Sequence, residues 1–421
     1  LEFELAELKL EFELAELKLE FELAELKAGG FTLAELKEVF TLRELYDAGF
    51  TIADLLALRG DINFVQIGQD IDGEAASDFS GFSVSTSADG SIVAIGAYGN
   101  NNANGDMSGH VRVYKNESGT WTQLGQDLDG EARGDYSGRA VSLSADGSIV
   151  AIGAHGNDAN GSSSGRVRVY KNESGTWTQI GQDIDGEAAG DYSGFSVSTS
   201  ADGSIVAIGA YGNDGNGSNS GHVRVYQNES GTWTQIGEDI DGEAAYDYSG
   251  WSVSLSADGS IVAIGAKGND DNGNLSGHVR VYKNESGTWT QIGEDIDGEA
   301  TEDFSGRSVS LSADGSIVAI GATGNDGNGS NSGHVRVYKN ESGTWTQIGQ
   351  DIDGEAASDS SGNSVSLSAD GSIVAIGASY NDGNGGNSGH VRVYQNVSGT
   401  WTQLGQDIDG EASDDFSGSS V

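Results

Sequence analysis

The chain of 421 residues contains no cysteine, no proline and a single methionine. The lack of cysteine excludes disulfides, zinc sites built on thiolates and thiol catalysis. Without proline, turns must be made by Gly, Asp, Asn and Ser, and 66 glycines are available for them. No run of about 18 apolar residues occurs, so we expect no membrane-spanning helix.

Positive charge is also scarce: 21 Lys and Arg stand against 65 Asp and Glu, which gives a formal net charge of −44. Nucleic acids and anionic membranes bind clustered lysine and arginine, so neither is expected as a partner. Two interpretations of the acidity stay open. Either the charge keeps the protein soluble in saline surroundings, or part of it holds Ca²⁺ or another hard divalent cation.

Internal repetition dominates the chain after residue 60. The phrase Asp-Ile/Leu-Asp-Gly-Glu-Ala begins at Asp70, Asp127, Asp183, Asp239, Asp295, Asp351 and Asp407. Each unit predicts four short strands, which in the first unit are residues 82–86, 92–97, 111–114 and 121–124. A four-stranded antiparallel unit of about 56 residues, repeated without helices, predicts an all-β propeller with one unit per blade.

The two ends of the repeat region leave the number of blades open. Six units are complete, an isolated outer-type strand is predicted at residues 64–67, and an inner-type strand at residues 419–421. A seven-bladed ring would use both to close its last blade, whereas a six-bladed ring would pack them elsewhere. The chain also begins at Leu1 without methionine, so we expect a processed or partial protein.

The first 60 residues have a different pattern from the rest. Thr32 with Glu35, Thr41 with Glu44 and Thr51 with Asp54 are spaced as helix capping pairs, and a nine-residue phrase begins at Leu1, Leu10 and Leu19. We therefore predict two domains: short helical tandem repeats over residues 1–60 and the propeller over residues 61–421.

Three phrases of each unit carry a family resemblance. In the first unit these are residues 79–84, 92–97 and 109–114, and over residues 62–421 they resemble the FG-GAP repeats of integrin-α-type propellers. The resemblance implies a propeller fold. Such repeats often carry an Asp-rich calcium loop between their first two strands, but here that connection is only Ala88-Asp89-Gly90-Ser91. The calcium site of the family is therefore not carried over to this turn.

Acidic loops are the predicted cation sites. In an antiparallel blade, the loop from the fourth strand to the next blade and the loop between the second and third strands lie on the same face. Asp-x-Asp-Gly-Glu offers the oxygen ligands that Ca²⁺ prefers, although solvated turn residues would look the same. The candidate metal ligands are Asp70, Asp72, Glu74, Asp78, Asp127, Asp129, Asp183, Asp185, Glu187, Asp191, Asp214, Asp239, Asp241, Asp295, Asp297, Asp351 and Asp353.

Selectivity for a ligand has to come from positions at which the repeats differ. Two such positions stand out, one directly after Ser-Gly and one directly after Gly-Ala, both where strands meet the loop-rich face. Drift at tolerant positions is the alternative explanation. The candidate ligand-binding residues are Phe82, Arg139, Phe195, Trp251, Arg307, Tyr98, His155, Tyr211 and Lys267.

Residues repeated in every blade are interpreted as structural. Five histidines open the third strand of their units, with Arg166 in the remaining unit, and this repetition favours packing over metal binding or catalysis. The tryptophan of each fourth strand is expected to seal neighbouring blades. Asn-x-Ser sequons in the exposed turn after the third strand predict glycosylation at Asn116, Asn172, Asn228, Asn284, Asn340 and Asn396.

No single asymmetric set of catalytic residues stands out, so the sequence predicts a protein that is not an enzyme. We expect an extracellular or cell-surface structural or adhesive module, whose partners are copies of itself, other matrix proteins or glycans. A lectin-like propeller that binds carbohydrate or protein is the alternative. Ca²⁺ is the only cofactor that the sequence suggests.

Overall fold

The computed structural model describes residues 64–421, and the predicted helical repeats of residues 1–60 lie outside the described residues. The described part is built of strands β1 to β29, without a helix among them. Accordingly, nothing in residues 64–421 has the length and hydropathy of a membrane-crossing helix.

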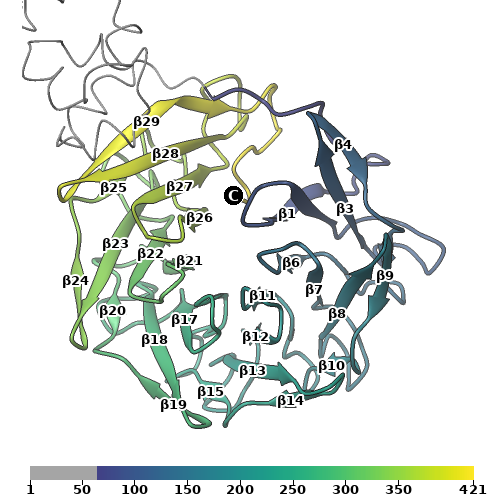
Figure 1. Ribbon diagram of the computed structural model, residues 1–421. Helices are drawn as coiled ribbons and strands as arrows, with labels where there is room; N and C mark the ends of the chain where they lie inside the picture. The colour runs from purple at the N-terminus through teal and green to yellow at the C-terminus, as the bar shows by residue number, and fades with distance from the viewer. Residues whose placement is uncertain (1–63) are drawn as a thin grey trace, which may run out of the picture. The chain divides into compact units, whose positions relative to one another are not determined.

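The strands form six antiparallel sheets around a central axis, which is the predicted all-β propeller (Figure 1). We number the sheets as blades 1 to 6 in chain order. Blade 1 consists of β1 (Ser80–Thr86), β2 (Ile92–Ala97), β3 (His110–Glu117), β4 (Thr120–Gln123) and β5 (Leu128–Asp129). The innermost strand comes first in each blade, and the later strands lie progressively further from the axis (Figure 1).

The other blades repeat this order. Blade 2 contains β6 (Ala140–Leu143), β7 (Ile149–Ala154), β8 (Arg166–Glu173), β9 (Thr176–Gln179) and β10 (Ile184–Asp185). Blade 3 contains β11 (Ser196–Thr199), β12 (Ile205–Ala210), β13 (His222–Asn228), β14 (Trp233–Gln235) and β15 (Ile240–Asp241). Blade 4 contains β16 (Ser252–Leu255), β17 (Ile261–Ala266), β18 (His278–Glu285), β19 (Thr288–Gln291) and β20 (Ile296–Asp297). Blade 5 contains β21 (Ser305–Leu311), β22 (Ile317–Ala322), β23 (His334–Glu341), β24 (Thr344–Gln347) and β25 (Ile352–Asp353). Blade 6 contains β26 (Ser364–Leu367), β27 (Ile373–Ala378), β28 (His390–Val397) and β29 (Thr400–Asp409).

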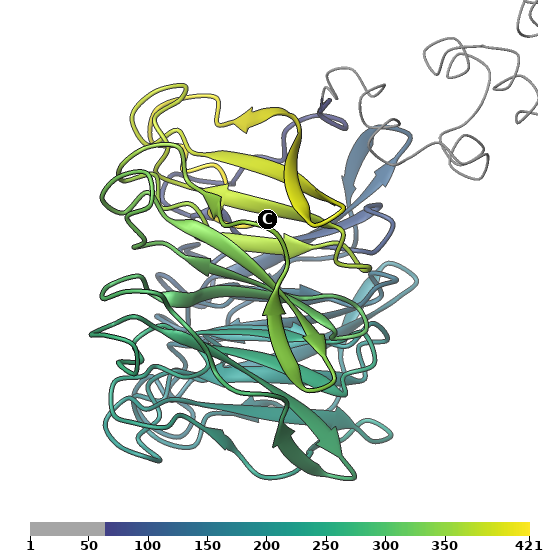
Figure 2. The same cartoon turned by 90° about the vertical axis from the view of Figure 1, so that its left-hand side faces the viewer.

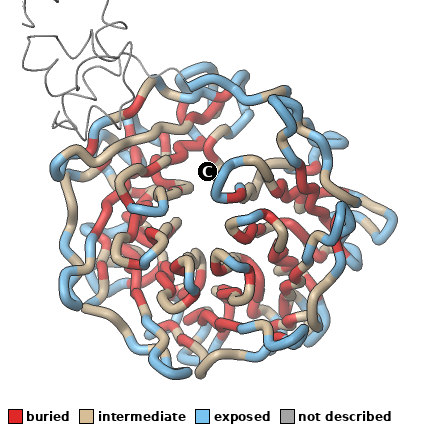
Figure 3. Tube along the Cα trace, in the orientation of Figure 1, coloured by how far each residue is buried: buried red, intermediate tan, exposed pale blue. Residues whose placement is uncertain are grey.

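Local sequence explains the central hairpin of each blade. β1 and β2 pair with Val84 opposite Ile95, and the turn between them contains Gly90 at a φ of 68°. Asp89 supports this turn by accepting hydrogen bonds from the Ser87 hydroxyl and the Ser91 backbone N–H. The second strands are apolar on both faces and are largely buried, as the red segments in the middle of the blades show (Figure 3).

The outer edge of a blade is more complex than a single fourth strand. β4 and β5 both pair with β3, and the chain leaves the ladder between them at Gly125, whose φ is 84°. Blades 1 to 5 therefore have a broken outer strand, whereas β29 of blade 6 runs through without interruption. The side view shows the strands crossing the ring between its two faces, where the turns and loops emerge (Figure 2).

Apolar side chains of neighbouring blades form shared cores. Val113 of blade 1 packs with Val150 and Ile152 of blade 2, and Trp177 completes the cluster with only 3% of its surface exposed. The Trp177 indole N–H donates to the Leu124 carbonyl oxygen of the preceding blade at 2.7 Å. This confirms the predicted sealing role of the repeated tryptophan.

The orphan segments at the two ends of the repeat region lie beside blades 1 and 6. The Trp121 indole donates to the carbonyl oxygen of Ile67, as Trp177 does to Leu124 one blade further on. At the other end, Ser364 donates to the Gly418 carbonyl oxygen, and the Ser420 hydroxyl accepts a hydrogen bond from the Val84 N–H of β1 at 3.0 Å. The described residues thus form six sheets, and residues 417–421 join blade 6 to blade 1 near the axis (Figure 1).

Candidate functional site

A cavity of about 680 Å³ lies at the centre of the ring. It is lined by the starts of the innermost strands, so the residue after each Ser-Gly faces it. Of the predicted ligand-binding residues, Phe82, Tyr98, Arg139, Phe195, Trp251 and Arg307 line this cavity. The other three follow directly after the second strands: His155 and Tyr211 make edge-to-face contacts with Phe195, and Lys267 lies over the Trp251 ring.

Cations lie against aromatic rings around the cavity. The Arg139 guanidinium lies 4.5 Å from the Phe82 ring centroid and 4.2 Å from that of Phe195. The Lys267 ammonium lies 3.2 Å from the Trp251 ring centroid, and the Arg307 guanidinium lies 5.4 Å from it. Such cation–π contacts hold a positive charge in place without neutralising it.

Within residues 64–421, neither Arg139, Lys267 nor Arg307 forms an ion pair with a carboxylate, although the chain has 65 acidic residues. Arg307 instead donates to the amide oxygen of Asn363 at 3.0 Å. Burial, together with the charges of Arg307 and Arg139, lowers the pKa of Lys267 to about 8. The positive charges of Arg139 and Arg307 in the cavity wall, and that of Lys267 beside Trp251, are thus not neutralised by a carboxylate.

Two carboxylates, Asp414 and Asp415, stand at the rim of the same cavity. Asp414 accepts a hydrogen bond from the Asn387 amide at 3.1 Å, and Asp415 accepts one from the backbone N–H of Ala412 at 2.6 Å. Both are exposed; Asp415 is held within its own loop and Asp414 by the loop between β27 and β28. The cavity lining therefore combines aromatic rings and two arginines with serine and valine side chains, and its acidic groups are the two exposed aspartates.

His155 makes the stability of this region depend on pH. It stacks on Tyr136 at 5.3 Å and meets the edge of Phe195 at 5.7 Å. Burial first, and then the charge of Arg139, lower its pKa from 6.5 to about 3. An unfolded chain takes up this proton below pH about 6.5 and the folded chain does not, so stability is full above that pH and is lost as the pH falls toward 3.

We predict that His155→Tyr removes this part of the acid sensitivity. Tyr98 and Tyr211 occupy the same position in the neighbouring units, so the substitution fits the ring. Between pH 7.5 and 5, the natural chain should lose about 2 kcal/mol more of unfolding free energy than the variant. Urea unfolding of both proteins at both pH values measures this difference. Titration of the carboxylates affects both proteins equally and therefore cancels from the comparison. Equal losses in both proteins would contradict the assignment.

The predicted metal residues separate into two groups. Five clusters each bring a glutamate, a histidine and an aspartate within reach of one ion, and one of them has a further aspartate. These acidic groups could hold a metal ion. The clusters contain Glu74, His110 and Asp127; Glu187, His222 and Asp239; Glu243, Asp271, His278 and Asp295; Glu299, His334 and Asp351; and Glu355, His390 and Asp407.

The other predicted ligands have different contacts. Asp78 and Asp191 are buried and accept hydrogen bonds from backbone N–H groups of their own loops, and Asp214 accepts one from the Asn219 N–H. Asp183 and Asp185 bind Arg166. Five of the predicted aspartates accept a hydrogen bond at their backbone carbonyl oxygen from an arginine of the blade that follows them. They are Asp72, Asp129, Asp185, Asp241 and Asp297.

The calcium loop implied by the family resemblance does not fit the turn at Asp89. That turn offers a single carboxylate, and hydrogen bonds from Ser91 and Ser87 lower its pKa to about 2. Its oxygens are thus engaged by the turn itself, and no other acidic side chain is part of it.

The predicted glycosylation sites lie at the ends of the third strands and not in exposed turns, and their amide nitrogens are buried. The Asn116 side-chain oxygen accepts a hydrogen bond from the Gly119 N–H at 2.9 Å, and the other units repeat this bond. In all six sequons the Nδ2 atom, to which a glycan would be attached, is buried and has no hydrogen-bond partner. This geometry argues against glycans on the folded protein.

The histidines opening the third strands are candidate metal ligands that sequence reasoning missed. They are buried, as a packing role predicts, yet each also faces carboxylates. Glu243, Glu299, Glu355, Asp271 and Asp407 were absent from the predicted ligands as well. The glutamates share the phrase Asp-Gly-Glu with the predicted Glu74 and Glu187, so the repeat itself was the signal that could have found them.

The fold defines a tandem-repeat β-propeller with a central cavity. A family model for the FG-GAP repeat matches residues 128–170, 184–226, 240–282 and 295–338. These four repeats match the FG-GAP repeat, as the sequence resemblance indicates. A search of curated protein sequences finds no significant match.

Three solved structures illustrate the fold. A candidate 6-phosphogluconolactonase from Bacteroides uniformis is 16% identical, with a TM-score of 0.53, and the match covers 78% of this chain and 85% of that one. The periplasmic gluconolactonase of Pseudomonas aeruginosa is 19% identical, with a TM-score of 0.53 and coverage of 79% and 86%. Hydrazine synthase of Kuenenia stuttgartiensis is 13% identical, with a TM-score of 0.50 and coverage of 83% and 92%.

These structures correct the expectation that the chain is not an enzyme. Two of them are named as lactonases and share the propeller, so repeated blades do not exclude catalysis. The sequence argument was wrong because it took the repetition of residues in every blade as evidence against an asymmetric catalytic set. In a propeller, an asymmetric site forms where different residues of several blades meet at the axis, as Arg139, Trp251 and Arg307 do here.

Proposed function

We propose that the central cavity binds an anionic carbohydrate, of the class of sugar acids and uronic-acid oligosaccharides. This is the lectin-like alternative that the sequence left open, with the ligand class made specific. The observation that carries it is the set of three cations without carboxylate partners, held against aromatic rings in a channel of a strongly acidic protein.

The chemistry of the lining supports this class of ligand. Aromatic faces such as Trp251 and Phe195 stack on the apolar faces of sugar rings, and guanidinium groups bind carboxylates through paired N–H donors. The volume of about 680 Å³ accepts a ligand of one to a few sugar rings. Two proteins of the same fold are named gluconolactonases, and opening of a gluconolactone yields a sugar acid.

The proposal includes an extracellular or cell-surface location, as the sequence led us to expect. One structure of the same fold is named as periplasmic, which supports an exported protein. Glycans are accordingly the partners we propose, ahead of self-assembly or adhesion to matrix proteins, because the variable residues converge on a cavity and not on an outer surface. Ca²⁺ has no part in this site, since its inner lining offers cations and rings.

Titration calorimetry with trigalacturonate, D-gluconate and neutral maltotriose tests the proposal. We expect the acidic ligands to bind and the neutral trisaccharide to bind at least about tenfold more weakly, because a charge-assisted hydrogen bond contributes about 1.5–3 kcal/mol. Lys267→Thr and Arg307→Asn should each weaken binding of the acid by about tenfold or more. Both variants carry residues already present at the same positions of the next blade, Thr323 and Asn363.

The matched control is Arg133→Gln, which also removes one positive charge. The Arg133 side chain is 79% exposed and pairs with Asp106, and it does not line the cavity. Its affinity for the acidic ligands should equal that of the natural chain. Equal weakening by all three variants would show a general charge effect, and equal binding of maltotriose would show that charge is not recognised; either result would overturn the proposal. Incubation with gluconolactone in the same series reports hydrolysis.

A further inference from the structure

The Glu–His–Asp clusters lie between successive blades, away from the channel. In each, the glutamate comes from the loop that leads into the blade, and the histidine and aspartate come from the blade itself. In blade 4, the His278 Nδ1 atom lies 3.7 Å from Asp295 Oδ2 and 4.0 Å from Glu243 Oε2. These separations are too long for direct hydrogen bonds. They are of the size expected when two donors each lie about 2.1 Å from one shared ion.

Neighbouring side chains fix which carboxylate oxygens face the histidine. Asp295 uses Oδ1 to accept a hydrogen bond from Gln291 at 2.6 Å, and its Oδ2 faces His278. Glu243 uses Oε1 for Arg280 at 3.3 Å, and its Oε2 faces the same nitrogen. Outer contacts of this kind orient the ligands of metal sites. The cluster in blade 4 therefore has its donor atoms aimed at one point.

The histidine nitrogens at this point are buried and unpaired. His278 has 0% and His222 has 1% of its side-chain surface exposed, and in both residues neither Nδ1 nor Nε2 has a hydrogen-bond partner. A buried polar atom without a partner costs free energy, so this position calls for one. The nitrogen directed at two carboxylates cannot be satisfied by them at 3.7 Å, but a cation between them satisfies all three groups.

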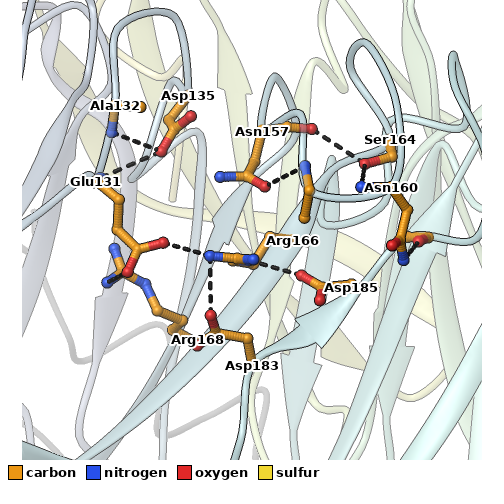
Figure 4. A network of polar contacts seen from close by, with 12 residues as sticks. Glu131, Ala132, Asp135, Asn157, Asn160, Ser164, Arg166, Arg168, Asp183 and Asp185 are labelled. Atoms are coloured by element: carbon orange, nitrogen blue, oxygen red, sulfur yellow. Dashed lines mark hydrogen bonds and ion pairs between the residues drawn. The ribbon is translucent and has the colours of Figure 1, made fainter.

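Blade 2 shows what fills this position when the histidine is absent. There Arg166 replaces the histidine, and its Nη1 atom binds Asp183 Oδ2 at 2.8 Å and also binds Glu131 Oε2 (Figure 4). These are the same oxygens that face the histidine in the other blades. Asp183 again uses Oδ1 for Gln179, and Glu131 again uses Oε1 for Arg168. The guanidinium group of Arg166, a cation that belongs to the chain itself, thus occupies the centre of this cluster.

Blade 4 has one more ligand than the other clusters. Asp271, in the loop between β17 and β18, joins Glu243, His278 and Asp295. The equivalent residues in blades 3, 5 and 6 are Gly215, Gly327 and Gly383. Three carboxylates and one imidazole thus give this cluster four donor groups, whereas each of the other clusters has three. The blade 4 cluster is accordingly the strongest of the five.

We propose that the Glu–His–Asp clusters of blades 1, 3, 4, 5 and 6 bind borderline divalent transition-metal ions such as Zn²⁺, with the tightest site at Glu243, Asp271, His278 and Asp295. The imidazole nitrogen selects Zn²⁺, Co²⁺ or Ni²⁺ over Ca²⁺, which prefers a shell made entirely of oxygens. Each ion links the loop entering a blade to the third strand and the outer edge of that blade. In blade 2, Arg166 takes the place of the ion.

Equilibrium dialysis of the chelator-treated full chain with Zn²⁺ tests the proposal. We expect one tight site and up to four weaker ones, and Co²⁺ should give an absorption spectrum with nitrogen and oxygen ligands. Asp271→Gly, which copies the neighbouring blades, should weaken the tight site by at least about tenfold while the number of weaker sites stays the same. His278→Gln should abolish that site. Arg166→His should increase the Zn²⁺ stoichiometry by one.

The control is Asp270→Asn, one residue from the proposed ligand. Asp270 accepts a hydrogen bond from the Leu275 N–H, which asparagine can also accept, so this variant removes charge without removing a ligand. Its Zn²⁺ affinity should stay within about twofold of the natural chain. No saturable Zn²⁺ binding, equal competition by Ca²⁺, or the same weakening by Asp270→Asn and Asp271→Gly would each overturn the proposal. Melting curves without metal show whether each variant is folded.

Discussion

Alanine in place of Gly209 is expected to lower the free energy of unfolding by about 3 kcal/mol. Gly209 lies in β12, where a Cβ atom would meet the Gly250 carbonyl oxygen at 2.1 Å and the Ser196 hydroxyl at 2.3 Å. Gly250 belongs to the next blade and immediately precedes Trp251 of the channel. The chain cannot relieve this clash by turning a side chain, because one of the obstacles is backbone. Blades 3 and 4 must therefore separate at their inner edge.

Urea unfolding measures the effect, and Gly386→Ala provides the control. At Gly386 a Cβ atom meets nothing within 4 Å, and Ser218 and Ser330 occupy the equivalent position in other blades. This variant should unfold within about 0.5 kcal/mol of the natural chain. Because Trp251 moves with Gly250, Gly209→Ala should also weaken binding of trigalacturonate. A loss of stability no larger than that of Gly386→Ala would show that the blades do not need this close contact.

Repetition made the fold largely predictable. The Asp89-Gly90 turn, the apolar run at residues 92–97 and the spacing of the Asp-Gly-Glu phrases each recur, so weak local signals reinforce one another through six units. The break in the outer strand was not predicted. It depends on Gly125 at a φ of 84° and on the Trp177 indole that binds the Leu124 carbonyl oxygen from the next blade. This hydrogen bond joins residues that are 53 positions apart, so the local sequence pattern around either residue does not indicate it.

The two candidate sites differ in how far sequence could predict them. The channel residues were identified because Arg139, Trp251 and Arg307 differ between otherwise equal units, and differences within a repeat are visible in the sequence. The metal clusters were only half identified. Asp295 and Asp297 look alike in the phrase Asp-Ile-Asp-Gly-Glu, yet Asp295 faces His278 whereas Asp297 presents its backbone carbonyl to Arg336. Strand register decides this, and spacing alone does not.

Methionine in place of Arg166 is expected to cost about 2–3 kcal/mol of unfolding free energy near neutral pH. The Arg166 side chain is 15% exposed and binds Glu131, Asp183 and Asp185, so its loss leaves three carboxylates facing one another. Removing one partner of a buried ion pair costs about 3–5 kcal/mol, and the lower figure here reflects carboxylates that are partly exposed. Urea unfolding at pH 7.5 measures it.

Lys171→Met is the matched control, since Lys171 lies on the same strand and pairs with Glu173 at 4.0 Å on the surface. An exposed pair contributes little, so this variant should change stability by less than about 0.5 kcal/mol. Arg166→His should be as unstable as Arg166→Met in the presence of a chelator and should recover with Zn²⁺, because only histidine can rebuild the cluster of the other blades. If Arg166→Met were no more destabilised than Lys171→Met, the carboxylates between blades 1 and 2 would not need a cation. The structural argument for a metal ion in the equivalent clusters of the other five blades would then be contradicted.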